Sequence, residues 1–373
     1  MKKIGILGGG QLGRMFIQEA VNFGLDIHIL DPDKNAPCSK MTAFFEKGSF
    51  KDFETVYNFG KDKDIVSIEI EHVNIEALKK LVVEGVEVYP QPEVLEMIQD
   101  KGLQKEFYQK NNIPTSDYIL LKDKKELLDN LDFLPAVQKM RKGGYDGKGV
   151  HVMKDQSKLE NAFDCPAVLE KLVNIKKEIS VIVARNKNGE IATFPTVELV
   201  FDPRANLVDY LFAPAELSHS LIEKANKIAI DIIEKMNMIG ILAVEMFVDE
   251  NDEILVNEMA PRAHNSGHHT IEANITSQYE QMLRAIMNWP LGDTSAKMMG
   301  AMVNLVGEDG YEGKAVYEGL EEVLKISGAK IHIYGKEITK PFRKMGHVTL
   351  IGKNKEEVLE KVNYIKENLK VKA

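Results

Sequence analysis

Short apolar runs and helical patterns alternate over the first quarter of the chain. The run KIGIL is followed by a stretch in which apolar residues recur at helical spacing, and then by the run DIHIL. Two further apolar runs, at 65–70 and 86–90, flank the helical pattern NIEALKKLVVEG. Strands that alternate with helices predict a mostly parallel sheet with helices packed on it. We therefore predict a small doubly wound α/β domain over residues 1–99.

The pattern changes in the middle of the chain. Residues 93–112 are polar with apolar positions at helical spacing, which predicts a pair of connecting helices. After Pro114 come apolar runs with strand character, such as EISVIVAR and ATFPTVELVF, separated by turns rich in Asp, Asn and Gly. A helix is predicted over 216–238, followed by the strands GILAVEMFV and EILVNEMA. These elements predict a central α+β domain over residues 100–296.

The last part of the chain, residues 297–373, carries short apolar runs and one long helical pattern. Strands are predicted at AMVNLVG, KIHIY and HVTLIG, and a final amphipathic helix at KEEVLEKVNYIKENL. We therefore predict a small β-rich C-terminal domain.

Composition and charge exclude several classes of protein. The chain has 373 residues, of which 44% are hydrophobic and 28% charged, as is usual for a globular protein with a full core. Its net charge of −9 argues against a nucleic-acid binder, which needs a basic surface. No run of about eighteen apolar residues occurs, so we expect no membrane span. The two cysteines, Cys38 and Cys165, form no disulfide framework and indicate a reducing cytoplasm.

The first predicted turn carries a fingerprint of dinucleotide-binding proteins. Gly8, Gly10 and Gly13 fit the spacing G-x-G-x-x-G between a strand and a helix. Asp31 ends the next strand, where such proteins carry an acid that binds a ribose. The fingerprint alone therefore suggests an oxidoreductase that uses a dinucleotide, although no second nucleotide-binding half accompanies it.

A second glycine-rich stretch, KMRKGGYDGKGV, follows an apolar run in the central domain. Its segment 143–149 holds four glycines in seven residues. Glycine lets backbone N–H groups approach an anion, and Lys139 just upstream can place a positive charge on a phosphate. The stretch is not a Walker A loop, because no G-K-[ST] enters a helix. Taken alone, it fits a phosphate-binding loop and a plain surface hairpin about equally well.

Two predicted neighbouring strands each carry one carboxylate among apolar residues. Glu245 shares a strand face with Phe247. Glu258 shares a face with Val256. Burying a carboxylate is costly unless a cation meets it. With Asn257 and bound phosphates nearby, the two carboxylates suit Mg²⁺, with Mn²⁺ as the other candidate ion. The alternative is a pair of solvated carboxylates at a sheet edge.

The loop APRAHNSGHHT, residues 260–270, concentrates polar groups. Arg262 offers a planar fork for a carboxylate or a phosphate, and His264 can donate to an oxyanion or move a proton. The spacing H-x-x-x-H-H without a nearby cysteine does not match the usual zinc sites. We therefore favour an anion site over a zinc site. The candidate catalytic residues are Arg262, His264, Asn265 and Ser266.

Together these motifs resemble those of the ATP-grasp superfamily, and most closely the N5-carboxyaminoimidazole ribonucleotide synthetases of purine biosynthesis. The resemblance is carried by GGGQLGRM (8–15), GGYDGKG (143–149), NEMAPRAHNSGH (257–268) and KEITKPFRKMGH (336–347). These motifs follow one another in the family's order, so the resemblance covers essentially the whole chain.

The resemblance implies what each domain does. Residues 1–99 would form a pre-ATP-grasp domain whose glycine turn receives the phosphate of a ribonucleotide, with Asp31 only a strand-end or turn residue. Residues 100–296 would form a two-lobed ATP-grasp domain with a lid around 115–173, and 297–373 the small C-terminal domain. ATP would bind in the central domain, where Glu245 and Glu258 would hold the metal. The implied ATP-binding residues are Lys101, Lys139, Gly143, Gly144, Tyr145, Asp146, Gly147, Lys148, Gly149, Glu170, Lys171, Leu172, Val173, Glu178, Asn257 and Glu258.

The resemblance also implies the reaction. Bicarbonate attacks the γ-phosphoryl group of ATP to give carboxyphosphate, and the exocyclic amine of 5-aminoimidazole ribonucleotide then takes up the carboxyl group. Arg262 and His264 would hold bicarbonate and carboxyphosphate. A cytoplasmic homodimer is expected, with neither nucleic acid nor membrane as a partner. The implied substrate-binding residues are Gly10, Gln11, Leu12, Glu71, Tyr145, Asp146, Lys148, Lys336, Arg343 and Lys344.

Three positions depart from the family's pattern. Phe201 stands where relatives commonly carry a polar residue, His72 where Asn is usual, and Lys148 where Arg is frequent. None of the three belongs to the acid pair or to the loop 260–270, so we expect activity to survive. Another ATP-grasp ligase or carboxylase, such as the formate-dependent glycinamide ribonucleotide transformylase, is the alternative.

Overall fold

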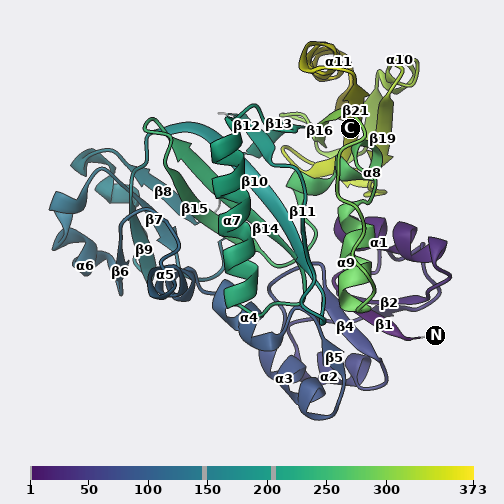
Figure 1. Cartoon of the computed structure of the whole chain (residues 1–373), viewed down its shortest axis with the longest axis horizontal. Coiled ribbons are helices and arrows are strands. Elements are labelled where there is room, and N and C mark those ends of the chain that lie inside the picture. The colour runs from purple at the N-terminus through teal and green to yellow at the C-terminus, as the bar shows by residue number, and fades with distance from the viewer. Residues whose placement is uncertain (1, 145–148, 203–206) are drawn as a thin grey trace.

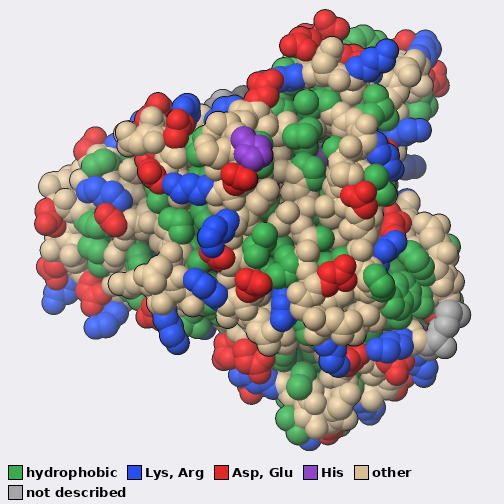
Figure 2. Space-filling view, in the orientation of Figure 1, with side chains coloured by type: hydrophobic (Ala, Val, Ile, Leu, Met, Phe, Trp, Pro, Cys, Tyr) green, Lys and Arg blue, Asp and Glu red, His purple; other side chains and the backbone are tan. Residues whose placement is uncertain are grey.

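The computed structural model describes residues 2–144, 149–202 and 207–373. Figure 1 shows the N-terminal region at lower right, a four-stranded sheet at left and the C-terminal region at upper right, all attached to a long central sheet. Acidic and basic side chains are interspersed over the face seen in Figure 2. No helix in the described ranges is long and apolar enough to cross a membrane.

The N-terminal region is a five-stranded parallel sheet in the order β3-β2-β1-β4-β5, as the alternating pattern predicts. Helix α1 packs against one face through Met15 and Phe16, and α2 and α3 cover the other face through Val56 and Leu78. The sheet is therefore doubly wound. Its strands are β1 (Ile4–Leu7), β2 (Ile27–Asp31), β3 (Phe45–Lys47), β4 (Ile65–Ile68) and β5 (Glu87–Val88), and its helices are α1 (Gln11–Asn22), α2 (Phe53–Gly60) and α3 (Ile75–Val83).

Two connecting helices lead into the four-stranded sheet, as the polar helical pattern predicts. Pro92 opens the first helix, where its missing N–H costs no hydrogen bond. Asp100 caps the second helix by accepting from the amide of Gly102 at 2.8 Å. The two connecting helices are α4 (Pro92–Ile98) and α5 (Lys101–Lys110), and a third helix, α6 (Lys124–Leu128), follows the first strand of the sheet. The sheet has the order β6-β9-β7-β8 and contains β6 (Tyr118–Leu121), β7 (Ala136–Met140), β8 (Val150–Met153) and β9 (Ala167–Lys171).

The central sheet has nine strands, eight of them in the order β15-β14-β10-β12-β13-β16-β21-β19, with β11 paired to β10. The run ATFPTVELVF forms two strands instead of one, because Pro195 between them cannot donate to a strand ladder. The sheet is continuous across the predicted boundary between residues 296 and 297. Its strands are β10 (Ile175–Arg185), β11 (Ile191–Thr193), β12 (Val197–Asp202), β13 (Leu207–Ala213), β14 (Gly240–Asp249), β15 (Ile254–Ala260), β16 (Met299–Val306), β19 (Ala329–Ile333) and β21 (Lys344–Gly352).

Helices cover this sheet through apolar stripes. In α7 the buried positions Ala225, Ile228, Ala229 and Ile232 recur at helical spacing, which explains why the helix lies across β10 and β14 in Figure 1. The remaining elements are α7 (His219–Lys235), α8 (Thr270–Ala273), α9 (Gln278–Ile286), α10 (Leu320–Val323), α11 (Lys355–Asn368), β17 (Gly313–Lys314), β18 (Val316–Glu318), β20 (Ile338–Thr339) and β22 (Lys370–Lys372).

Candidate active site

Three neighbouring strands of the central sheet bring one polar side chain each to the same face. Ser180 on β10 is the register partner of Glu245 on β14. Glu245 is in turn the register partner of Glu258 on β15. Residues opposite each other on paired strands project to the same side of a sheet. The sequence predicted the two acids as a pair but did not identify Ser180, because a buried serine on an apolar strand carries no signal of its own.

A β-bulge in β15 changes which residues face the site. The register shifts after the pair Glu245 and Glu258, so that Met246 lies opposite Val256 and Asn257 is the extra residue. The prediction that Glu258 shares a face with Val256 is wrong, because strict alternation does not hold across the bulge. Val256 is 1% exposed in the core, whereas the side chain of Glu258 is 47% exposed.

Lys101 forms an ion pair with one member of the acid pair. Its Nζ lies 2.8 Å from Glu258 Oε2, and its charge lowers the pKa of Glu258. Burial, the neighbouring charge of Glu258 and that of Glu178 raise the pKa of Glu245. Burial also raises the pKa of Glu178 to about 7. Ionising Glu245 and Glu178 is therefore costly in this environment, and a bound cation would stabilise their charged forms.

This arrangement fits a cation that binds together with phosphates. No group of three or more His, Cys, Asp or Glu in the described ranges is arranged to hold a metal by itself. Mg²⁺ is commonly held by one or two carboxylates, with substrate phosphates and water completing the shell. Glu245 and Glu258, with the Asn257 amide oxygen beside them, supply that kind of incomplete shell.

Glu170 connects the four-stranded sheet to α5 and to β15 through two lysines. Lys139 Nζ lies 3.0 Å from Glu170 Oε1 and donates to Asn257 Oδ1 at 2.8 Å. Lys105 Nζ lies 3.1 Å from Glu170 Oε2. Against the effect of burial, the two lysines hold the pKa of Glu170 below its usual value. Burial lowers the pKa of Lys105 to about 8.

Lys105 is not among the site residues predicted from the sequence. Its position four residues after Lys101 on one helix was a usable signal, because residues at this spacing lie on the same helix face. The side chain of Glu170, one of the implied ATP-binding residues, is buried among these lysines.

The base of the second glycine-rich stretch is fixed to the start of α5. Arg141 donates to Asp100 through Nε and Nη2, at 2.7 and 2.9 Å. Gly143 and Gly149 adopt positive φ angles of 83° and 81°, which favour glycine. Gly144 is also described. The predicted site residues Tyr145, Asp146, Gly147 and Lys148 lie outside the described residues.

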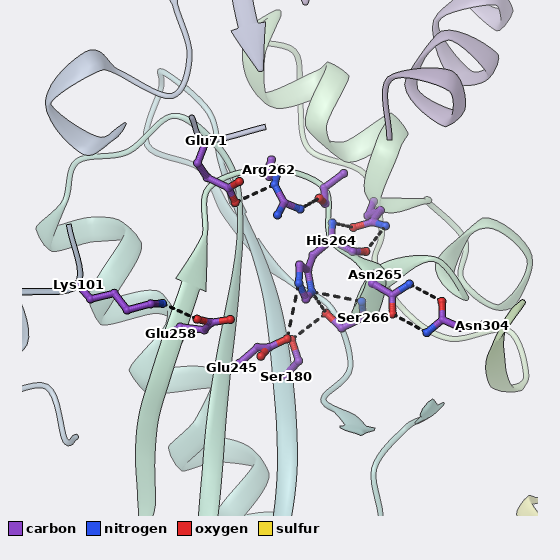
Figure 3. Close-up of polar contacts among 12 residues, drawn as sticks. Glu71, Lys101, Ser180, Glu245, Glu258, Arg262, His264, Asn265, Ser266 and Asn304 are labelled. Carbon is purple, nitrogen blue, oxygen red and sulfur yellow. Dashed lines mark hydrogen bonds and ion pairs between the residues drawn. The ribbon is translucent and has the colours of Figure 1, made fainter. Parts of the chain in front are cut away.

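Arg262 and Glu71 join two predicted sites that lie far apart in the sequence. Arg262 follows β15, and its Nε lies 2.8 Å from Oε1 of Glu71, which follows β4 of the N-terminal region. Figure 3 shows this ion pair above the acid pair. The family resemblance assigns Arg262 to bicarbonate and Glu71 to the ribonucleotide. Their contact shows that these two residues lie next to each other. A hollow of about 440 Å³, lined in part by His72 and Gly143, lies next to this region.

His264 is held in one tautomer by its neighbours. The backbone N–H of Ser266 donates to His264 Nδ1 at 3.3 Å, so this nitrogen accepts and Nε2 carries the proton in the neutral ring. Ser266 Oγ lies 2.9 Å from the same Nδ1 and 2.9 Å from Ser180 Oγ. His264 Nε2 lies 3.6 Å from Glu245 Oε1. The geometry therefore directs an N–H of His264 toward the acid pair, as Figure 3 shows.

Asn265, predicted to be catalytic, faces the C-terminal region. It exchanges two amide hydrogen bonds with Asn304 on β16, at 2.9 and 3.2 Å. Asn304 also donates to the carbonyl of Val208 at 2.7 Å. Asn265 therefore fixes the loop 260–270 against the neighbouring strands.

The three basic residues predicted in the C-terminal region differ in their surroundings. The positive charge of Lys344 counteracts the raised pKa of Glu245, so this lysine acts on the acid pair. Lys336 Nζ donates to the Lys344 carbonyl at 2.7 Å. Arg343 is bound to the carbonyl of Ile338 at 2.6 Å.

The amides of the first glycine turn bind carboxylates of the chain itself. Gly10 N and Gly13 N both donate to the carboxylate of Glu69, and Gly9 N donates to Asp31 Oδ2 at 2.7 Å. The turn was expected to be open to a substrate phosphate. This is wrong for the N–H of Gly10, which already donates to Glu69. Asp31 is a strand-end residue that braces the turn, as expected.

Glu69 is also not among the site residues predicted from the sequence. A signal was present, since Glu69 and Glu71 both follow the apolar run IVSI at the end of β4. In a parallel sheet this strand end lies beside the end of β1, where the glycine turn begins.

Three known domain families match the chain. The ribonucleotide synthetase preATP-grasp domain matches residues 1–99, and the ATP-grasp domain matches residues 106–279. The phosphoribosylaminoimidazole carboxylase C-terminal domain matches residues 300–361.

Individual relatives are similar over almost the whole length. The N5-carboxyaminoimidazole ribonucleotide synthase of Bacillus subtilis is 38% identical over 366 residues, covering 96% of this chain and 94% of that protein. The crystal structure of N5-carboxyaminoimidazole ribonucleotide synthetase from Thermotoga maritima matches over 100% of both chains, with a TM-score of 0.93 and 45% identity. The N5-carboxyaminoimidazole synthase from Aspergillus clavatus, solved with ADP and 5-aminoimidazole ribonucleotide, matches over 98% of both chains, with a TM-score of 0.90 and 32% identity.

Proposed function

The chain belongs to the family of N5-carboxyaminoimidazole ribonucleotide synthetases, and from this premise we propose that it is the ATP-dependent ligase that carboxylates 5-aminoimidazole ribonucleotide in purine biosynthesis. The observation that carries the proposal is the contact between Arg262 and Glu71, 2.8 Å apart, which Figure 3 shows above the acid pair. This contact joins the loop assigned to the carboxyl donor with the segment assigned to the ribonucleotide.

ATP and a divalent cation are the first components of the proposed site. Lys101 contacts Glu258 and Lys139 contacts Asn257, and we assign both lysines to the phosphates. Glu245 and Glu258 would hold Mg²⁺, or Mn²⁺ as the alternative ion. When bound, such an ion neutralises charge on the phosphates during transfer.

Bicarbonate is the proposed carboxyl donor. Its oxygen attacks the γ-phosphorus as ADP leaves, and this gives carboxyphosphate. Arg262 would bind the anion with its guanidinium, and His264 would donate from Nε2, which Ser266 leaves as the protonated nitrogen. Fixed donors of this kind stabilise charge that develops in the transition state.

The amine of 5-aminoimidazole ribonucleotide completes the reaction. Its nitrogen attacks the carboxyphosphate carbon, phosphate leaves, and the nitrogen loses a proton as the C–N bond forms. Glu71 from the N-terminal region and Lys344 from the C-terminal region are the described side chains that we assign to this substrate. The structure from Aspergillus clavatus, solved with ADP and this ribonucleotide, supports the choice of substrate.

We also propose that the protein acts in the cytoplasm as a homodimer. The family resemblance supports both statements, and the two free cysteines fit a reducing compartment. Light scattering of the purified protein measures the oligomeric state, and a monomer at micromolar concentration would contradict the dimer.

Phosphate release tests the proposed reaction. The protein is incubated with Mg·ATP and bicarbonate, with and without 5-aminoimidazole ribonucleotide, and phosphate and the carboxylated product are measured together. We expect the ribonucleotide to raise phosphate release, and the product to appear in equal amount only when bicarbonate is present. Turnover of glycinamide ribonucleotide with formate instead would favour the transformylase.

A titration with NADH tests the other class of function. The first glycine turn is filled by Glu69 and Asp31, so we expect NADH not to bind, whereas Mg·ATP binds. Saturable NADH binding that NAD⁺ competes would instead support an oxidoreductase.

A further inference from the structure

The three fingerprint glycines all face the same side chain, Glu69. Gly10 N donates to Glu69 Oε1, and Gly13 N donates to Glu69 Oε2 at 2.6 Å. A Cβ at Gly8 or Gly10 would overlap the Glu69 side chain, and a Cβ at Gly13 would lie 3.2 Å from Oε2. The glycines that allow a pyrophosphate to approach in other proteins therefore allow this carboxylate to approach here.

The start of α1 depends on this carboxylate. The N-cap residue Gly10 has no side chain to accept a hydrogen bond, and the first turn of α1 contains no acidic residue. The first amides of a helix need acceptors, and its N-terminus favours negative charge. Glu69 supplies both, and Asp31 supplies the acceptor for the neighbouring Gly9.

The same carboxylate fixes the segment that reaches the other domain. Glu69 directly follows β4, and its backbone N–H donates to the carbonyl of Leu7 at 3.0 Å. Two residues later, Glu71 meets Arg262 at 2.8 Å. Because the Glu69 side chain is bound to the start of α1, the position of Glu71 two residues later is restricted.

We propose that Glu69 is a positioning residue that occupies the anion site of the glycine turn and thereby holds Glu71 opposite Arg262. The kinetic part of this inference rests on the proposed function. Glu69 touches neither the acid pair nor the groups assigned to ATP. Its removal therefore disturbs use of the ribonucleotide and leaves use of the nucleotide intact.

The test is Glu69→Ala with small anions added back. We expect the KM for 5-aminoimidazole ribonucleotide to rise by about tenfold to a hundredfold, the range that loss of hydrogen bonds to a charged group implies. The KM for ATP stays within about twofold. Acetate or formate restores the ribonucleotide KM by filling the vacated anion site, whereas acetamide, a neutral molecule of similar shape, does not.

Asp31→Ala is the matched control, because it also removes a carboxylate bound to an amide of the same turn. Asp31 lies at the end of β2, on a different strand from the one that precedes Glu71, so its removal does not free Glu71. We therefore expect Asp31→Ala to lower the thermal stability without changing the KM for the ribonucleotide. Glu69→Gln keeps the shape and one acceptor, so we expect an intermediate KM. If Glu69→Ala does not fold, the same measurements are made on Glu69→Gln.

Two results would overturn the proposal. One is an unchanged ribonucleotide KM in a folded Glu69→Ala protein. The other is a parallel rise of both KM values that acetate does not reverse, since this marks a general structural role. If the wild-type protein itself does not carboxylate the ribonucleotide, the proposed function has failed. Thermal stabilisation of Glu69→Ala by acetate, absent in the wild type, then decides whether Glu69 fills the anion site.

Discussion

The glycine turn of the N-terminal region and the acid pair on β14 and β15 both carry sequence motifs for charged ligands, but they differ in how their charge is balanced. In the turn, amides that favour an anion already bind the carboxylate of Glu69. In the acid pair, Lys101 forms an ion pair with Glu258, whereas burial and the neighbouring charge of Glu258 raise the pKa of Glu245.

This difference shows that a motif for binding a charged ligand does not by itself identify an open binding site. A glycine turn shows that an anion can bind, and the sequence elsewhere decides whether the protein supplies that anion. A buried carboxylate whose charge is only partly compensated is costly by itself and is stabilised when a cation binds. The unbalanced region is therefore the one that we assign to a dissociable ligand, and the following experiments test that contrast.

Glu258→Gln tests the acid pair and has the largest expected effect. The variant keeps the shape of the side chain but loses the charge that binds the cation and Lys101. We expect turnover to fall at least about 10³-fold, since several kcal/mol of charge stabilisation are lost, while the fold remains. Mg²⁺-dependent phosphate release measures the effect. Glu253→Gln, on the hairpin that joins the same strands, is the control and stays near wild type, and a normal kcat for Glu258→Gln would exclude the acid pair from catalysis.

Arg262→Ala tests the contact between the two regions. Loss of one preorganised donor lowers kcat by about 10²–10³-fold. His264→Asn retains more activity if its role is to donate a hydrogen bond. ATP affinity stays nearly constant in both variants, because Lys101, Lys139 and the acids are intact. Calorimetry and bicarbonate-dependent phosphate release on the same preparations check this, and joint loss of stability and ATP binding would show that the loop only packs beneath the site.

Gly10→Ala tests whether the glycine turn is filled by Glu69. The added methyl group would overlap Glu69 Oε1, and we expect a loss of about 1–3 kcal/mol in the free energy of unfolding. In a Glu69→Ala background the same substitution has room and costs less. Urea unfolding of both single variants and the double variant measures the coupling. Additive effects would show that the two residues do not compete for space.

Glu178→Gln tests the cost of burying a charged carboxylate in this site, measured through pH, and has the smallest expected effect. Burial raises the pKa of Glu178 from 4.5 to about 7, so the folded protein binds a proton that the unfolded chain releases. The contribution of Glu178 to the free energy of unfolding therefore falls as pH rises from about 4.5 to about 7 and then levels off. The difference in the free energy of unfolding between the variant and wild type therefore shifts in favour of the variant by about 1–2 kcal/mol from pH 5 to pH 8. Thermal unfolding without nucleotide measures this, and a constant difference between the two proteins would contradict the raised pKa.

Local patterns predicted the elements and the motifs. The alternation of strands and helices gave the doubly wound N-terminal sheet, because apolar periodicity depends only on neighbouring residues. Helix α7 and the acids on β14 and β15 were found in the same way. The motifs also indicated the family, which the matches along the chain then showed. The domain boundaries and the roles of the site residues stay predictions.

What the sequence could not decide depends on partners distant in the chain. The bulge that shifts Asn257 toward Lys139 arises from the pairing of β14 with β15, and local alternation does not reveal it. Glu69 fills the glycine turn from more than fifty residues away in the sequence. The glycine fingerprint therefore reads the same whether or not the turn is filled. A motif specifies which groups are present, whereas only the folded chain determines which of their charges and hydrogen bonds are already satisfied, because that balance is set by residues brought together in space.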